Sequence, residues 1–215
     1  MWDTIDLPGA DLRLHAQWLE VDAAQALFET LRAQLPWEVH RVRLFGREVD
    51  SPRLSCWIGD ADAVYTYSGV RHAPQPWPVA LRPIRERLTR ELVTPFNSVL
   101  ANLYRDGNDA IGWHADDEQE LGPQPVIAAL SLGAARRFLL KPKSAAPEPS
   151  GVAQPALSLD LTPGSLLVMA GDTQHRYRHA LPRTRRTDGA RISLTFRYTL
   201  SARIFVKDAE PAALS

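Results

Sequence analysis

Cysteine is nearly absent from this chain, and that absence excludes two kinds of site. Cys56 is the only cysteine among the 215 residues. A disulfide within the chain is therefore impossible, and a zinc site built from several cysteines is excluded. Proteins of reducing compartments use few disulfides, so the sequence predicts a cytoplasmic protein.

Net charge and long apolar segments are also lacking. The 25 basic and 25 acidic residues give a formal net charge of +0, so the overall balance indicates neither a nucleic acid nor a membrane as partner. No apolar run approaches the roughly 20 residues that a membrane-spanning helix needs. The acidic start, Met1-Trp2-Asp3, does not resemble a targeting leader. We therefore expect no membrane contact, and we expect a monomer.

Lysine is scarce, which leaves arginine as the main cation. Lys141, Lys143 and Lys207 are the only lysines among the 25 basic residues. The planar guanidinium of arginine binds phosphate or carboxylate through two parallel hydrogen bonds. A codon bias toward arginine would explain the same composition, so the count alone favours neither reading.

Two helices are predicted in the first part of the chain. Apolar residues recur at helical spacing from about residue 23 to 35, and Asp22 can cap the start of that helix. A second helix is predicted at about 78–92, where Pro83 indicates a kink or a late start. Between them, residues 39–67 alternate apolar and polar side chains, which predicts short strands and hairpins broken near residues 45–47 and 59–60.

Short strands dominate the rest of the chain. They are predicted at about 97–104, 112–115, 126–132, 137–140, 156–160, 165–169 and 191–200. The segment 142–154 is rich in proline, alanine and serine and is expected to be a disordered connector. Two helices followed by about eight strands predict an α+β, mainly β fold, a double-stranded β-helix or jelly-roll with the N-terminal helices packed on one sheet.

We expect one domain over residues 1–215. Its predicted parts are an N-terminal segment at 1–95, a jelly-roll core at 96–200 and a tail at 201–215. A chain of this length, 45% of it hydrophobic, can bury a sizeable core.

A histidine and an aspartate separated by one residue form the first candidate for a metal site. His114 and Asp116 are expected on a strand, where residues two apart project from the same face. Two imidazoles and one carboxylate on one face of a metal leave about three coordination positions open, as non-haem Fe(II) oxygenases require. The sequence therefore predicts an iron site, provided that a second histidine joins the pair.

That second histidine has two candidates. His175 and His179 lie four residues apart, and spacing alone does not choose between them. Farther along, Arg191 and Arg197 are six residues apart on an expected strand, so both should point to one face. Guanidinium groups there could bind the carboxylate of an anionic co-substrate in a bidentate, charge-assisted pair.

Several motifs follow one another in a fixed order along the second half of the chain. They are Asn102–Gly107, Ile111–Glu118, Ser131–Ala134 with Arg137-Phe138, Pro163–Leu167, His179–Pro182 and Arg191–Arg197. In this order they resemble the motifs of the AlkB family of Fe(II)- and 2-oxoglutarate-dependent nucleic-acid demethylases. The similarity runs from about residue 45 to 200 and is greatest to the branch that acts on duplex DNA. This resemblance selects His179, the histidine before Ala-Leu-Pro, as the third ligand.

The resemblance also implies how the cofactors are held. It assigns Fe(II) to His114, Asp116 and His179, with O2 as the oxidant. It assigns 2-oxoglutarate to Asn102, Tyr104, Arg191, Ser193 and Arg197. The implied reaction is the oxidative demethylation of 1-methyladenine or 3-methylcytosine in DNA, with release of formaldehyde, succinate and CO2.

Substrate residues follow from the same resemblance. Tyr65 and Tyr67 resemble the lid that holds a flipped base, which an enzyme must extract because a base inside a duplex cannot reach a buried metal. Phe45 resembles an apolar finger that fills the vacated place in the stack. Glu118 could accept a hydrogen bond from the exocyclic amine of the base.

A cluster of arginines, Arg183, Arg185 and Arg186, could bind phosphates, although a solvated charged loop has the same composition.

Three other functions compete with DNA repair. A dioxygenase of the same fold could act on RNA, a protein or a small molecule, because fold does not determine substrate. A catalytically silent nucleic-acid-binding module is disfavoured by the intact set of metal and arginine residues. Zinc-dependent hydrolysis is disfavoured because it would leave Arg191 and Arg197 without a task.

Overall fold

A computed structural model describes residues 1–44, 47–63, 65–67, 70–143, 157–187 and 189–200. For residues 42–44, 47–48, 65–67 and 70–72 it describes the backbone alone. Phe45 and the tail at 201–215 lie outside the described residues, as do residues 144–156, which include most of the connector predicted at 142–154. Within those that are described, no helix has the length and apolar character needed to cross a membrane.

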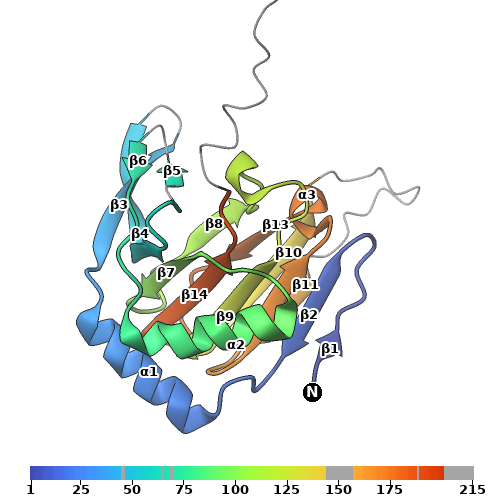
Figure 1. Cartoon of the computed structure of the whole chain (residues 1–215), viewed down its shortest axis with the longest axis horizontal. Coiled ribbons are helices and arrows are strands. Elements are labelled where there is room, and N and C mark those ends of the chain that lie inside the picture. The colour runs from blue at the N-terminus through green and yellow to red at the C-terminus, as the bar shows by residue number, and fades with distance from the viewer. Residues whose placement is uncertain (45–46, 64, 68–69, 144–156, 188, 201–215) are drawn as a thin grey trace, which may run out of the picture.

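Two antiparallel sheets face each other and form most of the molecule (Figure 1). In spatial order, the large sheet contains β1 (Asp3–Thr4), β2 (Asp11–His15), β12 (Leu166–Ala170), β9 (Ile127–Gly133), β14 (Arg191–Arg197), β7 (Ser98–Tyr104), β4 (Arg47–Gly59) and β3 (Glu38–Leu44). The small sheet contains β11 (Leu157–Leu161), β10 (Arg136–Pro142), β13 (Tyr177–Leu181) and β8 (Ile111–His114). A separate two-stranded ribbon pairs β5 (Tyr65–Tyr67) with β6 (Val70–His72).

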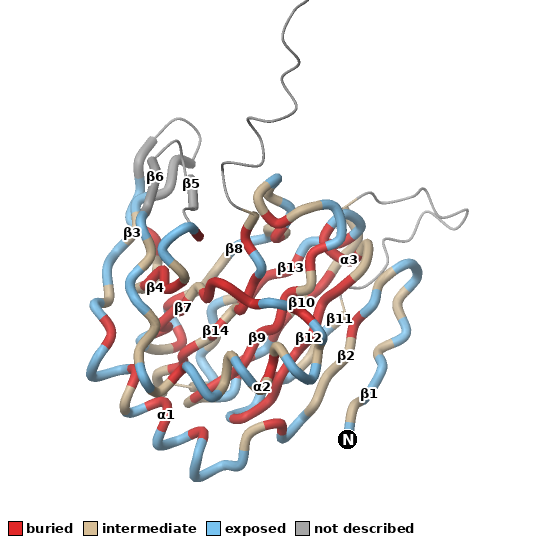
Figure 2. The backbone as a smooth tube through the Cα atoms, viewed as in Figure 1, coloured by how far each residue is buried: buried red, intermediate tan, exposed pale blue. Residues whose placement is uncertain are grey.

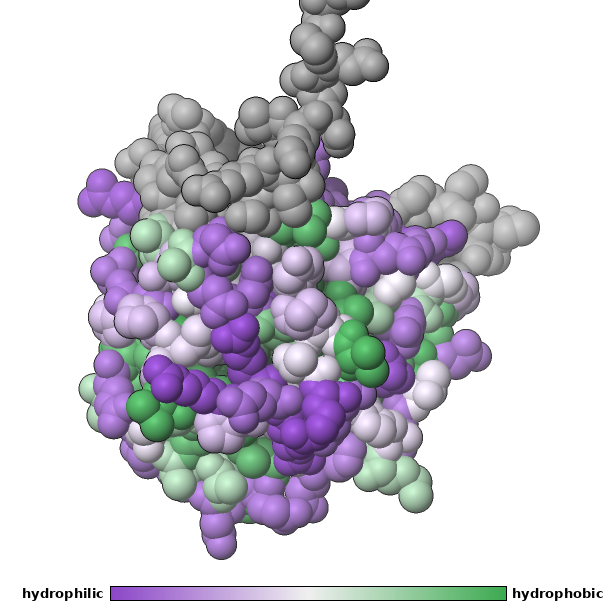
Figure 3. Space-filling model, viewed as in Figure 1, coloured by the Kyte–Doolittle hydropathy of each residue, from purple (hydrophilic) through white to green (hydrophobic). Residues whose placement is uncertain are grey.

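Helices cover the outer face of the large sheet. They are α1 (Val21–Gln34), the 3-10 helix η1 (Val79–Leu81) and α2 (Arg82–Leu92). Phe28, Leu31 and Leu88 pack in one buried cluster with sheet residues such as Leu130 and Leu194. Figure 2 shows buried stretches both in the helices and in the strands of the large sheet. The solvent side of α2 is polar, as the hydrophilic band over this helix in Figure 3 shows. The predicted jelly-roll with helices on one sheet is confirmed.

A second apolar cluster fills the space between the two sheets. It includes Ile127 and Met169 from the large sheet and Phe138 and Leu140 from the small one. Central strands of the large sheet such as β9 and β12 therefore have two buried faces, one toward the helices and one toward the small sheet. Because successive side chains on a strand alternate between faces, neighbouring residues enter different environments.

The observed starts of the two helices agree only in part with the predicted ones. Helix α1 begins at Val21, with Glu20 as its N-cap and no side-chain capping bond, so Asp22 is not the cap. Asp22 instead lies in the first turn, where its carboxylate faces the positive end of the helix dipole. The late start predicted from Pro83 is confirmed, because α2 begins at Arg82 with this proline in its first turn.

The strand predictions were also incomplete. Residues 39–67 do not form only short strands, since β4 runs for 13 residues and pairs with both β3 and β7. The sequence patterns missed β1, β2, β13 and the short helix α3 (Thr173–Arg176). Strand β13 follows α3 without an intervening turn, so no glycine or proline marks its start. With β13 included, eight described strands follow α2.

Candidate active site

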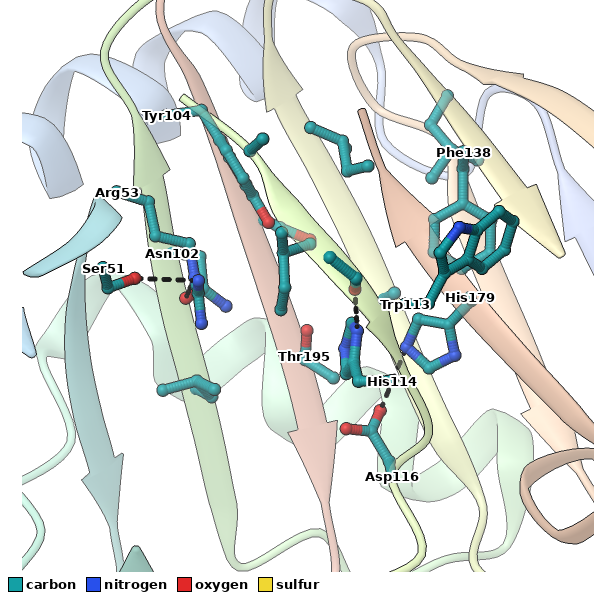
Figure 4. A pocket seen from close by; sticks show the side chains of 18 of the residues that line it. Ser51, Arg53, Asn102, Tyr104, Trp113, His114, Asp116, Phe138, His179 and Thr195 are labelled. Atoms are coloured by element: carbon teal, nitrogen blue, oxygen red, sulfur yellow. Dashed lines mark hydrogen bonds and ion pairs between the residues drawn. The ribbon is translucent and has the colours of Figure 1, made fainter. Parts of the chain in front are cut away.

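Three side chains converge beside the edge strand of the small sheet. His114 ends β8 and is the cross-strand partner of His179 in β13. Asp116 lies two residues past β8, so the expectation that it shares a strand with His114 is wrong. The ligand atoms of His114, Asp116 and His179 nevertheless lie within 4.8 Å of one another, and their side chains meet in Figure 4. This group can hold one metal ion.

His175 lies apart from this group. It belongs to α3, is exposed, and has its Nε2 against the backbone carbonyl of Pro123. The cross-strand pairing of His179 with His114 is the feature that separates the two histidines, and local spacing could not have revealed it.

The protonation of the two converging histidines suits metal binding. The Nδ1 of His114 lies 2.8 Å from the carbonyl oxygen of Gly112, to which it can only donate. In the neutral ring this leaves the lone pair on Nε2 for a metal. Burial, and then the neighbouring His114, lower the pKa of His179 to about 3, so this ring is neutral near pH 7.

Asp116 is fixed by two contacts from distant parts of the chain. Arg197 donates from Nη2 to its Oδ1 at 2.5 Å, and both side chains are buried. Burial alone would raise the pKa of Asp116, but the positive charge of Arg197 lowers it below its ordinary value. The backbone N–H of Asp116 donates to the Oε1 of buried Gln174 at 2.9 Å. A residue beyond the end of its strand is thus held in place as a carboxylate.

A cavity of about 470 Å³ between the sheets is bordered by His114, Asp116, His179 and Arg197. The residues predicted for the co-substrate, Asn102, Tyr104, Arg191, Ser193 and Arg197, all line it. Alternation along β14 explains their position, because Ile192, Leu194 and Phe196 pack toward the helices while the residues between them face the cavity.

Arg191 is a buried cation that pairs with no carboxylate of the described residues. Its side chain is 1% exposed, and its Nη2 donates to the Oγ of Ser131 at 2.8 Å. Its Nε and Nη1 have no hydrogen-bond partner among the described residues. Burial lowers the pKa of Arg191 to about 10, yet the side chain remains charged at neutral pH. Unpaired guanidinium N–H groups at a cavity wall indicate a site for a carboxylate or phosphate.

The amide of Asn102 is oriented by a residue that the sequence patterns did not reveal. Arg53 of β4 donates from Nε to the Oδ1 of Asn102 and from Nη1 to the Oγ of Ser51, each at 2.8 Å. With its oxygen engaged, Asn102 has its Nδ2 left to donate. Arg53 and Ser51 line the same cavity (Figure 4).

Arg136 is a second buried arginine that was missed. It donates to the backbone carbonyls of Asp106, Asp109 and Pro182, and it therefore ties two loops to β10. Its position, two residues before Phe138 on the same strand, would have indicated an inward side chain. Phe138 in turn stacks on the ring of His179, with the ring centroids 5.2 Å apart.

Only some of the residues predicted to bind the substrate line the cavity. Glu118 and Arg183 line the cavity, whereas Arg185 and Arg186 are exposed and do not. Tyr65 and Tyr67 lie in β5, whose backbone alone is described. The position of Phe45 is outside the described residues.

Comparison with known families gives one match over most of the chain. The family model described as the 2OG-Fe(II) oxygenase superfamily matches residues 11–197. That range includes the whole converging group and every residue predicted to bind the co-substrate.

Curated relatives are similar over most of this chain. The DNA oxidative demethylase ALKBH2 of Arabidopsis thaliana is 36% identical, over 92% of this chain and 69% of its own length. The human protein of the same name is 34% identical, over 93% of this chain and 77% of its own length. The human alpha-ketoglutarate-dependent dioxygenase alkB homolog 3 is 35% identical, over 86% of this chain and 64% of its own length.

Solved structures agree on the fold. The structure titled OsALKBH1 has a TM-score of 0.54 at 16% identity and covers 90% of this chain and 98% of its own. A Pseudomonas putida prolyl-4-hydroxylase has the same TM-score at 15% identity and covers 89% and 93%. At such low identity these matches show the fold alone.

Proposed function

The chain belongs to the 2OG-Fe(II) oxygenase superfamily, and from this premise we propose that it removes methyl groups oxidatively from alkylated bases in DNA. It is an Fe(II)- and 2-oxoglutarate-dependent dioxygenase, with O2 as the further co-substrate. The relatives named as DNA oxidative demethylases support the DNA substrate. The proposed lesions are of the 1-methyladenine and 3-methylcytosine type.

His114, Asp116 and His179 are proposed to hold the iron. Two neutral imidazoles and one carboxylate are the donor set of the facial triad that leaves positions open for other ligands. When bound, the iron supplies the oxygen chemistry, in which one oxygen atom enters succinate and the other enters the methyl group. Gln174 and Arg197 hold Asp116 in position for this role.

The 2-oxoglutarate is proposed to lie along the cavity wall formed by β7 and β14. Arg191 would pair with the distal carboxylate through its unpaired N–H groups. Asn102, Tyr104 and Ser193 border the same wall and would add hydrogen bonds. Arg197 already neutralises Asp116, so we expect it to bind the co-substrate more weakly than Arg191 does.

The proposed reaction balances as follows. The methylated base, 2-oxoglutarate and O2 give the hydroxymethyl base, succinate and CO2. The C–N bond of the hydroxymethyl base then breaks and releases formaldehyde, so that the electron pair of this bond stays on the ring nitrogen and the hydroxyl proton passes to water. The protein contributes placement, since holding the methyl carbon close to the oxidant replaces a slow encounter. Apolar residues such as Phe138, Leu161 and Met169 line the cavity and exclude water from it.

Substrate binding is proposed from the mouth of the cavity outward. Tyr65 and Tyr67 would hold the extruded base, Glu118 would accept a hydrogen bond from it, and Phe45 would fill the space left in a duplex. Arg183 borders the cavity and would bind a nearby phosphate, with Arg185 and Arg186 farther out. RNA as a second substrate, the monomeric state and the cytoplasmic location stay predictions.

The observation that carries this proposal is the meeting, in one cavity, of a metal-binding group and a buried arginine that has no counter-ion in the described part of the chain. The test is a mass-spectrometric assay of the protein, loaded anaerobically with Fe(II), on methylated DNA, methylated RNA and free methylated nucleosides. We expect the greatest turnover on DNA that contains 1-methyladenine or 3-methylcytosine.

Two variants complete this assay. Asp116→Ala removes a proposed iron ligand and should abolish turnover, whereas Arg90→Gln changes an exposed residue on α2 and should leave it unchanged. Turnover of RNA, nucleosides or another small molecule without turnover of DNA would replace the DNA substrate with that class. No turnover of any methylated oligonucleotide would exclude base demethylation.

A further inference from the structure

The outer face of the small sheet carries a group of residues that the proposed chemistry does not use. Trp113 in β8, Lys141 in β10 and Arg178 in β13 belong to it. Their strand neighbours, His114, Leu140 and His179 respectively, face the space between the sheets. Because strand side chains alternate, Lys141 and Arg178 point to the opposite, outer face. The ring of Trp113 lies on that face too, because it contacts the ammonium group of Lys141.

The two cations of this group, Lys141 and Arg178, repel each other. Lys141 and Arg178 are direct cross-strand partners, and like charges in that position are destabilising. Neither has a carboxylate partner among the described residues. Other cations of this face lie against acids: Lys143 is ion-paired with Asp117, and Arg137 is the cross-strand partner of Asp160.

Trp113 lies beside these two cations and is exposed to solvent. It is 39% exposed, more than any other tryptophan of the described chain. The Nζ of Lys141 lies 4.3 Å from the centre of its ring, so the indole reaches across β13 toward β10. Four other indole N–H groups, those of Trp18, Trp37, Trp57 and Trp77, donate to protein acceptors. The indole N–H of Trp113 has no acceptor in the described part of the chain.

We propose that Trp113, Lys141 and Arg178 form a docking surface for the nucleotides that flank the methylated base on its strand. This inference rests on the proposed function. An exposed aromatic ring offers a face to a base of any sequence, and two cations that no described carboxylate neutralises offer charge to the phosphates. The indole N–H adds a donor for a phosphate oxygen.

The place of this surface fits a strand whose methylated base has entered the cavity. Trp113 directly precedes His114 of the metal-binding group, and it lies at the rim of the cavity while its ring contacts Lys141 on the outer face. β8 is the edge strand of the small sheet, so nothing in the described chain pairs beyond it. A strand leaving the mouth therefore meets Trp113 first and the two cations next.

The experiment compares affinities for a methylated 12-nucleotide DNA strand and for the mononucleotide with the same lesion, which has no flanking nucleotides, by competition in fluorescence anisotropy. Trp113→Leu should weaken binding of the longer strand by about 5- to 100-fold, as loss of one stacked base does, and that of the mononucleotide by less. Trp113→Phe should lose less than Trp113→Leu. The double variant Lys141→Gln/Arg178→Gln should lower the log–log salt dependence for the longer strand by about 1.4, for two phosphate contacts.

Controls separate docking from folding and from catalysis. Arg90→Gln removes an exposed charge from the opposite side of the large sheet and should bind both lengths as the wild type does. Each single glutamine variant should melt at or above the wild-type temperature, because it relieves the like-charge pair. If Trp113→Leu lowers the melting temperature, the double variant decides the question.

The outcomes distinguish the two proposals. Wild-type turnover together with unchanged affinities of the variants for both lengths would overturn the docking surface and leave demethylation intact. Length-dependent binding that the variants lose, without turnover of any methylated base, would support the surface and overturn demethylation. Equal losses on both lengths would also overturn the surface.

Discussion

Replacement of Arg191 by methionine should separate co-substrate binding from protein stability. In the wild type the buried guanidinium has one hydrogen bond, to Ser131, and two nitrogens without partners in the described structure. Burial lowers its pKa from an ordinary 12.5 to about 10. At about 1.4 kcal/mol per pKa unit, the empty site disfavours the cation by about 3 kcal/mol.

Arg191→Met removes this cost together with one hydrogen bond, which contributes about 1 kcal/mol. The free energy of unfolding without co-substrate should therefore stay the same or rise by about 1–2 kcal/mol. Loss of a buried charge pair with 2-oxoglutarate costs about 2–5 kcal/mol, which corresponds to an increase in Kd of about 30-fold to several thousand-fold. Calorimetric titration and urea unfolding measure these two quantities.

Arg136→Met is the matched control. Arg136 is also buried, but it donates to three backbone carbonyls, so its loss should lower the unfolding free energy by about 3 kcal/mol or more. A wild-type Kd for 2-oxoglutarate in Arg191→Met, or a stability loss like that of Arg136→Met, would refute the assignment of Arg191 to the co-substrate.

Three further predictions concern the metal site and the substrate. Gln174→Leu leaves the backbone N–H of Asp116 without its acceptor and should weaken iron binding by about 10- to 100-fold; unchanged affinity in a metal titration would contradict this. Because the pKa of His179 is about 3 in the folded protein and about 6.5 in the unfolded chain, the unfolded chain binds more protons between these values. Metal-free stability should therefore fall as the pH drops from 6.5 toward 4, by at most about 1.4 kcal/mol per pH unit from this group, and His179→Gln should flatten the profile in chemical unfolding. Phe45→Ala should reduce turnover of duplex DNA more than that of single-stranded DNA, while Val93→Ala, at an 89% exposed position of the helical side, should not; equal losses would remove the finger role.

Alternation along strands made much of the site predictable. Arg191 and Arg197 were expected on one face because six residues separate them, and both line the cavity. The same rule, applied to Phe138 in β10, would have found Arg136. Local patterns thus sufficed for side-chain direction wherever the strand itself was recognisable.

Contacts between distant segments could not be predicted in this way. The bond from Arg197 to Asp116 spans 81 positions, and that from Asp116 to Gln174 spans 58. Both depend on how the chain crosses between the sheets, and Gln174 lies in a four-residue helix that no periodicity indicates. Spacing left His175 and His179 equivalent, while the pairing of β13 with β8 distinguishes them.

The most direct test of the central claim is the stoichiometry of products from one reaction. The wild type, with Fe(II), 2-oxoglutarate and a DNA strand containing 1-methyladenine, should yield succinate, formaldehyde and restored adenine in a ratio of about one to one to one, as single oxidative removal of each methyl group requires. Succinate formed without formaldehyde or adenine, at a rate that the methylated strand does not increase, would contradict DNA demethylation by this enzyme.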